Sequence, residues 1–317
     1  MAKNLTVTIV GAGRYGKELI APAYARNPRA TLRGVISPTT SPEALAGTAL
    51  QDVPLFHTVQ GWEKAMGKAT DADVFDLAVH PHVLPGLVED LAAIGAKNFI
   101  FPKPVAVSEE NLGTLRMLKE RSALSIVVAS QWHYSRLTQR IQELIQEGSQ
   151  KRAIARVRLD WRQALTGYTP AAALLPHMLQ IIYSCGLVSP TSQLTVRSSS
   201  ERHLDIVLSS DGMLIELFTD IQTSERKRTL EVFVEGNETP ILAADFLAVF
   251  KDGVAINPPS LFYEGRKEEF SEDILGKMTD AVIQAFLDNS LEKDPSILTF
   301  DRYLPINELL LRILKAL

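Results

Sequence analysis

The chain has 317 residues, 46% of them hydrophobic and 22% charged, which is the composition of an ordinary globular protein with room for two domains. Its formal net charge of -4 gives no electrostatic reason to expect a nucleic acid or an anionic membrane as partner. The basic run 226–228 is short and indicates a solvated loop or strand end.

The N-terminal sequence and the cysteine content indicate a cytoplasmic protein. The opening residues, MAKNLTVTIVGAG, contain no long apolar segment before a small-residue cleavage site, so no signal peptide is evident. The most apolar stretch, 171–188, is interrupted by Pro176, His177 and Gln180 and is too polar for a membrane span. The single cysteine, Cys185, excludes an intrachain disulfide, and its apolar neighbours predict a buried thiol.

The first third of the chain alternates short apolar runs with helical patterns. This alternation is typical of parallel strands joined by right-handed crossovers, and apolar strands without period-2 polarity fit a sheet covered on both faces. We therefore predict a Rossmann dinucleotide-binding domain over residues 1–128. The predicted strands are 5–10, 31–36, 55–56, 74–79, 98–101 and 125–130, and the predicted helices are 15–26, 42–49, 61–66, 84–94 and 109–121.

After residue 128 the pattern changes to that of an α+β domain with a largely antiparallel open sheet. Strand-like alternation recurs between turn triplets such as Ser-Asp-Gly, Glu-Gly-Asn and Lys-Asp-Gly. We expect residues 129–317 to form a domain for substrate binding and oligomerisation. The predicted helices are 135–147 (ending at Gly148), 170–183, 270–290 and 305–316, and the predicted strands include 153–163, 204–209, 213–218, 229–235 and 247–250.

The first predicted strand is followed by a G-x-G-x-x-G motif that opens a helix, which is the context that dinucleotide binding requires. Gly11 allows a tight turn, Gly13 lets a pyrophosphate approach the backbone, and Gly16 permits close packing of helix on strand. Arg14 and Tyr15 lie inside the same loop, where the helix N-terminus offers oriented N–H groups to an anion. A glycine turn without a ligand is the other interpretation.

The end of the second predicted strand favours NADP(H) over NAD(H). An NAD site carries an acidic residue there for the ribose hydroxyls, whereas this chain has Ser37, Thr39 and Thr40 and no carboxylate to repel a 2′-phosphate. Arg14 offers a positive charge to that phosphate or a surface for stacking on the adenine.

The chain resembles the Gfo/Idh/MocA oxidoreductases, a family that includes glucose–fructose oxidoreductase and inositol dehydrogenase, over essentially its whole length. The similar parts are the glycine loop, the run 99–104 (FIFPKP), the change to an antiparallel sheet, and a closing helix with Met278, Phe286 and Leu287. The resemblance implies an NAD(P)-dependent oxidoreductase with a Rossmann domain and a sheet domain through which relatives pair.

The resemblance also assigns roles to Lys103 and His177. The family's Glu-Lys-Pro motif places its lysine beside the nicotinamide, where it assists proton transfer; Lys103 occupies that position, with Pro102 in place of the glutamate. A second motif has an aspartate, a histidine four residues later and often another aspartate three residues on. His177 fits the histidine, whereas Ala173 and Gln180 stand at the aspartate positions.

The residues themselves support a role for Lys103. It lies between two prolines directly after a buried strand, at the sheet edge where open α/β folds bind ligands. A cationic nicotinamide nearby would lower the pKa of a lysine and help it exchange protons. A surface lysine in a loop is the other interpretation for Lys103, and a hydrogen-bonded core histidine is the other one for His177.

Two further segments are candidates for the same cleft. His80 and Pro81 follow the strand 74–79 and are predicted to contact the cofactor. Gln131, Trp132 and Tyr134 follow the predicted strand 125–130 and are predicted to bind substrate, although the two aromatic residues fit packing between domains equally well. No histidine has carboxylate or cysteine partners at metal-ligand spacing, and no G-x-S-x-G sequence is present, so we expect neither a metal site nor a serine hydrolase.

These observations predict an NADP(H)-dependent oxidoreductase that acts on a small carbonyl, hydroxyl or imine substrate. The other hypothesis is a non-catalytic NAD(P)-binding regulator or redox sensor of the same fold. The retained lysine favours the enzyme and the missing acidic residues favour the sensor. We also expect a homodimer or homotetramer that assembles through the C-terminal sheet, because its alternating strands give the second face enough apolar residues to need a cover.

Overall fold

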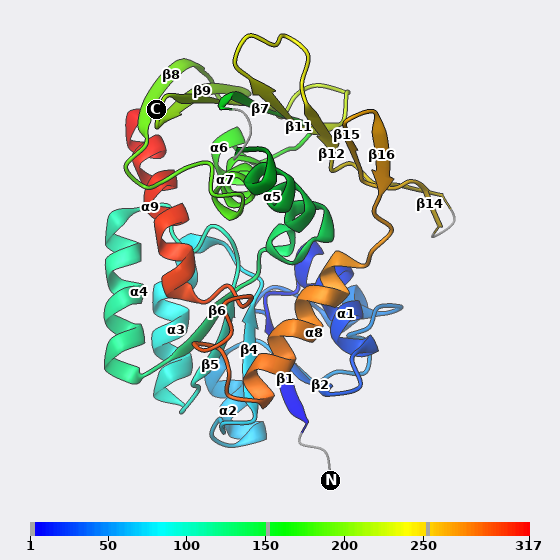
Figure 1. Ribbon diagram of the computed structural model, residues 1–317. Coiled ribbons are helices and arrows are strands. Elements are labelled where there is room, and N and C mark those ends of the chain that lie inside the picture. Colours follow the sequence, from blue (N-terminus) through cyan, green and yellow to red (C-terminus); the bar gives the residue numbers. More distant parts are fainter. Residues whose placement is uncertain (1–3, 150–152, 252–253) are drawn as a thin grey trace. The chain divides into compact units, whose positions relative to one another are not determined.

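The computed structural model describes residues 4–149, 153–251 and 254–317, which divide into two compact units (Figure 1). Unit 1 comprises Met1–Gln131 and Asp273–Leu304, and unit 2 comprises Trp132–Glu272 and Pro305–Leu317. The contacts of Asp273–Leu304 thus group this segment with the N-terminal residues in unit 1. From the sequence it was expected to be part of the second domain.

Unit 1 is built on a six-stranded parallel sheet, sheet A, in the order β3-β2-β1-β4-β5-β6. This Rossmann-type sheet confirms the predicted fold of the first third of the chain. Its strands are β1 (Leu5–Val10), β2 (Ala30–Ile36), β3 (Leu55–Phe56), β4 (Asp73–Leu77), β5 (Asn98–Phe101) and β6 (Ser125–Val128).

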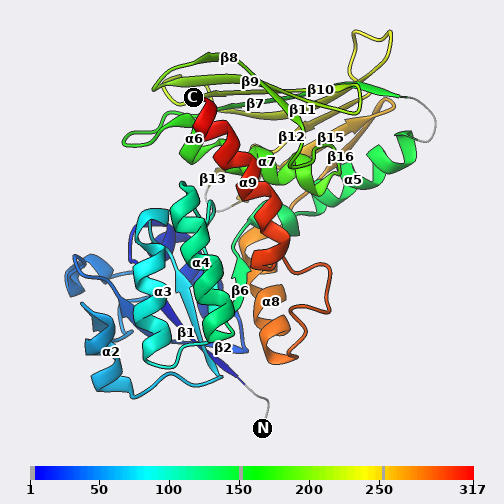
Figure 2. The same ribbon diagram turned by 90° about the vertical axis from the view of Figure 1, so that its left-hand side faces the viewer.

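Helices cover both faces of sheet A, with α3 and α4 together on one face and α1 and α8 together on the other (Figures 1 and 2). The helix after the glycine loop starts as a π-helical segment, η1, and continues without a break into α1. The helical segments of this unit are η1 (Tyr15–Ile20), α1 (Ala21–Arg26), η2 (Pro42–Leu45), α2 (Val59–Met66), η3 (Pro81–Val83), α3 (Leu84–Ala93), α4 (Glu109–Ser122), α8 (Ile274–Leu287) and the start of α9 (Phe300–Ala316).

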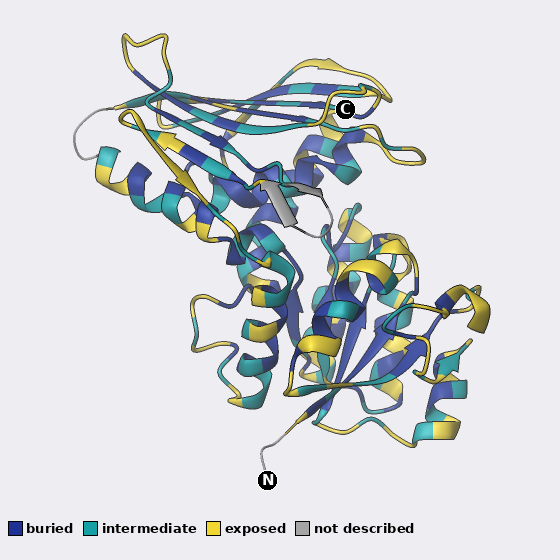
Figure 3. Cartoon of the chain, turned by 90° about the vertical axis from the view of Figure 1, so that its right-hand side faces the viewer, coloured by how far each residue is buried: buried dark blue, intermediate teal, exposed yellow. Residues whose placement is uncertain are grey.

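The core of unit 1 consists of the apolar strand residues that the sequence pattern identified. Val7, Ile9, Phe75, Leu77 and Phe99 are fully buried, and Figure 3 shows the sheet strands as largely buried against exposed outer helix faces. Burying each such side chain contributes about 1.5–3 kcal/mol to folding.

Unit 2 contains an eight-stranded sheet, sheet B, in the order β16-β15-β12-β11-β7-β10-β9-β8. All its pairs are antiparallel except β7 with β10, so the predicted largely antiparallel sheet is confirmed. Its strands are β7 (Ile154–Arg162), β8 (Gln193–Ser199), β9 (His203–Ser210), β10 (Met213–Asp220), β11 (Lys227–Val234), β12 (Leu242–Asp245), β15 (Ser260–Tyr263) and β16 (Arg266–Glu269), while β13 (Val249–Lys251) and β14 (Val254–Asn257) form a separate pair.

The helices of unit 2 pack on one face of sheet B (Figure 2). They are η4 (Gln131–Tyr134, which starts in unit 1), α5 (Arg136–Ser149), α6 (Pro170–Ala173), α7 (Leu175–Ser184) and the end of α9. No helix in the described parts of either unit is both long and apolar enough to cross a bilayer.

The other face of sheet B carries paired charges as well as exposed apolar side chains. Nε of Arg158 lies 3.8 Å from Oε2 of Glu216, and its Nη1 lies 3.9 Å from Oε2 of Glu231. These ion pairs join three strands. Among its apolar residues, Leu214 and Phe262 are exposed by 43% and 52%.

Several predicted helix boundaries were wrong for reasons visible in the backbone. The helix predicted at 42–49 is one short turn, because the backbone leaves the helical region at Ala46 and Gly47 has a φ of 71°. The helix predicted at 170–183 is broken at Leu174, before Pro176. The last helix includes Pro305 instead of starting there.

Further boundaries also differ from the predicted ones. The helix predicted at 270–290 starts only at Ile274, where Asp273 caps the N–H of Gly276. The helix predicted to end at Gly148 continues through it to Ser149. The run predicted at 247–250 is a strand only from Val249, and part of the Lys-Asp-Gly turn after it lies outside the described residues.

Candidate functional site

The glycine loop after β1 needs glycine at two positions for reasons of the fold alone. Gly11 has a φ of 96°, and its N–H donates to the carbonyl of Ile36 over 2.8 Å. A Cβ at Gly11 would collide with the carbonyl oxygen of Ala78, and a Cβ at Gly16 would collide with the carbonyl oxygen of Gly11. Both glycines are therefore required by the close packing of this loop on itself and on the end of β4.

Gly13 differs from the other two glycines because the protein itself leaves room for a side chain there. It is exposed, its φ is not positive, and a Cβ at this position would meet no atom within 4 Å. A glycine here is explained if another molecule approaches the backbone, as a pyrophosphate does in dinucleotide-binding folds. The neighbouring Arg14 is exposed, with an ion pair of 3.4 Å to Glu18, and Tyr15 starts η1.

The segment after β2 presents hydroxyl groups and no carboxylate. Ser37 is buried and its Oγ lies 2.7 Å from Oγ1 of Thr40, so the two hydroxyls form a pair. Thr39 is exposed beside them. The preference for NADP(H) that the sequence of this segment suggested stays a prediction.

His57 joins this group and was missed by the sequence analysis. Its Nδ1 lies 3.1 Å from the carbonyl oxygen of Ser37. Because a carbonyl oxygen only accepts, Nδ1 carries the proton in this contact. The signal was present in the sequence, since His57 directly follows β3, a neighbour of β2 whose carboxyl end must lie at the same edge of the sheet.

The end of β4 carries His80, Pro81 and His82. The two imidazole rings are stacked, with centroids 4.8 Å apart and planes 21° apart. Burial, together with the nearby His82, lowers the pKa of His80, which favours the neutral form of its ring. A neutral ring at this edge is suited to contact with a cofactor without repelling a cationic nicotinamide.

Lys103 follows β5 between Pro102 and Pro104 and is half-buried. Phe101 before it and Val105 after it are fully buried, so the lysine backbone is held on both sides by core residues. The position expected to carry a glutamate is the half-buried Pro102, which supplies no charge to orient the lysine.

The strand order places these groups in one sequence along a single edge of sheet A. Parallel strands have their carboxyl ends at the same edge, and β1 lies between β2 and β4, with β5 next to β4. From one side to the other, the edge therefore presents His57, the Ser37–Thr40 pair, the glycine loop, His80 and Lys103. This is the order in which an extended dinucleotide presents its adenosine ribose, pyrophosphate and nicotinamide ends.

In unit 2, His177 on α7 lies within a cluster of aromatic side chains. Trp132 and Trp161 are buried, with ring centroids 5.8 Å apart, and Phe246 packs edge-on against Trp132 at 5.1 Å. The ring of His177 lies 5.5 Å from that of Trp161. Trp132 thus packs inside unit 2, and Tyr134 is also buried, with its ring 5.1 Å from that of His133.

The contact between Trp132 and His177 determines the tautomer of the histidine. Nε1 of Trp132 lies 3.1 Å from Nδ1 of His177, and an indole N–H can only donate. Nδ1 is therefore the acceptor, and the neutral ring carries its proton on Nε2. In this state His177 can donate a hydrogen bond through Nε2 but cannot take up a proton there.

The two positions expected to carry aspartates do not present acidic groups. Ala173 ends α6, and the break at Leu174 separates it from the helix of His177. Gln180 is buried and donates from Nε2 to Oγ of Ser184 over 2.8 Å, within its own helix. Gln131, the other predicted substrate residue, is half-buried in unit 1, and its Oε1 makes no hydrogen bond within the described residues.

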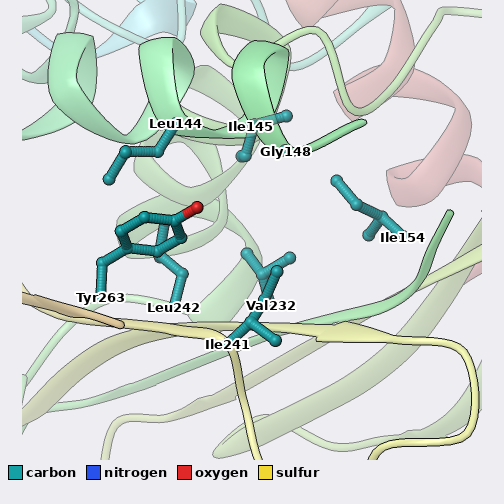
Figure 4. A pocket seen from close by; sticks show the side chains of 8 residues that line it. All are labelled: Leu144, Ile145, Gly148, Ile154, Val232, Ile241, Leu242 and Tyr263. Atoms are coloured by element: carbon teal, nitrogen blue, oxygen red, sulfur yellow. The ribbon is translucent and has the colours of Figure 1, made fainter. Parts of the chain in front are cut away.

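Other places in unit 2 are poor candidates for chemistry. The hollow in Figure 4, lined by Leu144, Val232 and Tyr263 among others, has a volume of about 10 Å³, enough for about one water molecule. Burial raises the pKa of the Cys185 thiol to about 12, so it is no nucleophile. Across the residues that the structure describes, no three His, Cys, Asp or Glu side chains form a metal-binding group.

No protein-family model matches the chain, and no curated protein matches it. Solved structures do match over nearly the whole chain. UDP-N-acetylglucosamine 3-dehydrogenase GnnA from Acidithiobacillus ferrooxidans is 16% identical, with a TM-score of 0.69 over 98% of this chain and 96% of that one.

Two further similar structures were solved with a nicotinamide cofactor. GenD2 from gentamicin A biosynthesis, in complex with NAD, is 16% identical, with a TM-score of 0.73 over 100% of this chain and 93% of that one. The other is a variant of KijD10, a 3-ketoreductase from Actinomadura kijaniata, in complex with TDP-benzene and NADP. It is 11% identical, with a TM-score of 0.74 over 99% of this chain and 97% of that one. The chain thus has the fold of Gfo/Idh/MocA-type oxidoreductases, as the resemblance implied.

Proposed function

We propose that this chain is an NADP(H)-dependent oxidoreductase that transfers a hydride between the nicotinamide and a small carbonyl, hydroxyl or imine substrate. The observation that carries the proposal is the open position at Gly13, where the fold would accept a side chain and the sequence has none. Within the motif, Gly11 and Gly16 are explained by the fold itself, whereas a bound pyrophosphate would explain the glycine at position 13.

The residues along the edge of sheet A fit such a cofactor. The glycine loop would hold the pyrophosphate with backbone N–H groups. Ser37 and Thr40, with no carboxylate beside them, would accept a 2′-phosphate, which supports NADP(H) over NAD(H). Arg14, exposed at the start of the helix, adds a positive charge to the same region.

When bound, a nicotinamide dinucleotide supplies a hydride donor or acceptor. The protein must then bind the substrate and move one proton. Lys103 is the candidate for that proton, because its backbone is held between core residues at the end of the edge where the nicotinamide would lie. Its Nζ would protonate the substrate oxygen or nitrogen during reduction and take the proton back during oxidation.

His177 would act as a hydrogen-bond donor rather than as a base. The indole of Trp132 holds its Nδ1 as an acceptor, so Nε2–H is the group that can polarise a substrate oxygen. With Lys103 transferring the proton and His177 donating a hydrogen bond, the proposed reaction needs no carboxylate at positions 173 and 180.

The names of similar proteins support testing ketones and secondary alcohols first. A 3-dehydrogenase and a 3-ketoreductase both interconvert a hydroxyl and a keto group. The substrate of this chain is proposed to belong to the same chemical class, with imines as the next to be tested.

A non-catalytic NAD(P)-binding regulator is the second candidate. The observation that favours it is the absence of acidic groups at Pro102, Ala173 and Gln180. A protein of this kind would bind the cofactor but turn over no member of a substrate panel.

The substitution Gly13→Ala tests the proposal at its main observation. Because the added methyl group meets no protein atom, we expect unfolding of the free protein to be unchanged or slightly shifted to higher temperature. The same methyl group would lie against the pyrophosphate, and we expect NADPH affinity to fall about tenfold or more, or about 1.4 kcal/mol. Calorimetric titration with NADPH measures the affinity.

Gly113→Ala is the matched control, because Gly113 lies in α4 and also has no neighbour within 4 Å of a Cβ. This variant should bind NADPH as the unaltered chain does. Equal NADPH affinity in all three proteins would overturn the proposed cofactor site. NADPH binding without oxidation by any ketone or imine of the panel would favour the regulator.

A further inference from the structure

Arg228 occupies an unusual position on the helix-covered face of sheet B. In the strand register it lies opposite Trp161 of β7, and Trp161 lies opposite Thr219 of β10. Side chains of directly paired residues point to the same face of a sheet. Arg228, Trp161 and Thr219 therefore form a row across three adjacent strands, on the face against which α7, the helix of His177, packs.

The guanidinium group of Arg228 has no acidic partner among the described residues. Its Nη2 donates to Oε1 of Gln163 over 2.5 Å, and its central carbon lies over the ring of Trp161, 5.3 Å from the centroid. The adjacent Lys227 points to the other face and pairs with Asp160 at 2.8 Å. Partial burial of the guanidinium charge costs free energy of folding, and an amide and an aromatic ring offset only part of that cost. The position of Arg228 therefore requires an explanation.

Burial and the neighbouring Arg226 lower the pKa of Arg228 to about 10. Arg228 is nevertheless a cation at neutral pH. An anion placed beside it would relieve part of the cost of its burial.

The other two members of the row also have unused donors. Nε1 of Trp161 and Oγ1 of Thr219 are buried and have no hydrogen-bond partner within the described part of the chain. Most buried polar atoms in proteins are paired, and exceptions require an explanation. An N–H, an O–H and a guanidinium group together offer donors to an oxygen-rich anion.

We propose that Arg228, with Trp161 and Thr219, binds an anionic group of the substrate, either a carboxylate or a phosphate. A guanidinium fork binds both groups through two parallel hydrogen bonds. The inference rests on the proposed function and narrows its substrate class to anionic ketones or alcohols. The ring of His177, 5.5 Å from that of Trp161, connects the anion site to the donor proposed for the reacting oxygen.

Tryptophan fluorescence provides the test, because Trp161 lies under the guanidinium group. The protein is first saturated with NADP+, which keeps phosphate out of the cofactor site, and is then titrated with succinate or inorganic phosphate at constant ionic strength. We expect a saturable change in fluorescence with at least one anion. The anion that binds more tightly assigns the group as carboxylate or phosphate.

Three variants make the assignment specific. Arg228→Gln should weaken anion binding about tenfold or more, and Arg228→Lys should weaken it less because the charge remains. Arg226→Gln is the matched control: it removes an exposed charge two residues away and should change anion binding less than twofold.

Two results would overturn the proposal: no saturable change with either anion, or equal weakening by the substitutions at Arg226 and Arg228. If Arg228→Gln does not fold, the Arg228→Lys variant and the titration of the unaltered chain still test whether Arg228 binds an anion. NADP+ binding is measured separately by calorimetry. A protein that does not bind NADP+ would count against the proposed function. A protein that binds NADP+ but neither anion would count against the anion site alone.

Discussion

The residue on which the proposed chemistry depends most is Lys103. Replacement by alanine removes the only group proposed to transfer a proton, so we expect kcat to fall by roughly 10²–10⁴ while NADPH affinity stays within a few-fold. Steady-state kinetics with an active ketone, together with calorimetric titration, measures both quantities.

Lys97→Ala is the control for this prediction, because Lys97 lies just before the other end of β5, where its Nζ donates to the carbonyl of Ser122. It should leave kcat unchanged. A Lys103→Ala variant that retains activity within a few-fold would show that the lysine is structural. Combining Lys103→Ala with His177→Ala tests whether both side chains act on one substrate, since groups that act together lose less than the sum of their separate effects.

We expect the preference between NADP(H) and NAD(H) to depend on Ser37. Its side chain is buried and paired with Thr40, so an aspartate at position 37 would place a carboxylate where the 2′-phosphate is proposed to lie. We expect Ser37→Asp to shift the ratio of NADPH to NADH affinity about tenfold or more toward NADH, through charge repulsion. Ser37→Ala separates the loss of the hydroxyl from the gain of charge. An unchanged ratio in Ser37→Asp would mean that the 2′-phosphate is recognised elsewhere.

At the scale of elements, β4 carries two buried aspartates with opposite titration behaviour. Burial raises the pKa of Asp76 to about 7, although the hydroxyl of Tyr24 donates to its Oδ2 over 2.7 Å. Asp73 is also buried, but hydrogen bonds from Thr6, Arg33 and Thr70 hold its pKa below the ordinary value. The number of donors around each carboxylate decides which form the fold stabilises.

This difference predicts how stability depends on pH. The unfolded chain releases the Asp76 proton near pH 4, whereas the folded chain holds it until about pH 7, so the free energy of unfolding falls as pH rises through that window. The full effect is at most about 4 kcal/mol, from three pKa units. We expect Asp76→Asn to be more stable than the unaltered chain at pH 8 and to lose that advantage at pH 5.

Urea unfolding at the two pH values measures the effect. Asp73→Asn is the control on the same strand, and its sign is opposite: Asp73 stabilises the fold when ionised, and this contribution is lost as pH falls through its lowered pKa. If Asp76→Asn gave the same stability difference at pH 5 and pH 8, Asp76 would not titrate in this range.

At the scale of the whole molecule, we expect a homodimer or homotetramer that assembles through sheet B. In the described part of unit 2, the second face of this sheet has no helix on it, and Leu214 and Phe262 are exposed there. The ion pairs around Arg158 would lie inside or around such an interface, which suits an association weakened by salt.

Light scattering at micromolar concentration tests the assembly. We expect Leu214→Arg to lower the measured mass toward that of one chain, and Met117→Arg, an exposed position on α4, to leave it unchanged. A mass of one chain at all concentrations for the unaltered protein would contradict the prediction.

The sequence by itself determined the elements of sheet A and the glycine loop. A short apolar run between turn residues indicates a buried strand without reference to distant residues. All six strands of sheet A were therefore predicted. Gly11 has a positive φ and Gly16 packs on Gly11, so part of the need for both glycines arises within a loop of a few residues. The change of period after residue 128 indicated a second sheet. Boundaries at Ala46 and Leu174 were missed, because one or two backbone angles end a helix without changing its apolar pattern.

Only the tertiary structure decided which distant residues meet. The hydrogen bond from Trp132 to His177, the row from Arg228 to Thr219 and the contact of His57 with Ser37 each depend on packing or strand pairing between separate segments. A local pattern indicates that a residue is buried or lies at a strand end, but not what lies across from it. Tautomer, pKa and unpaired donors follow from those neighbours, and so does the chemistry proposed for this protein.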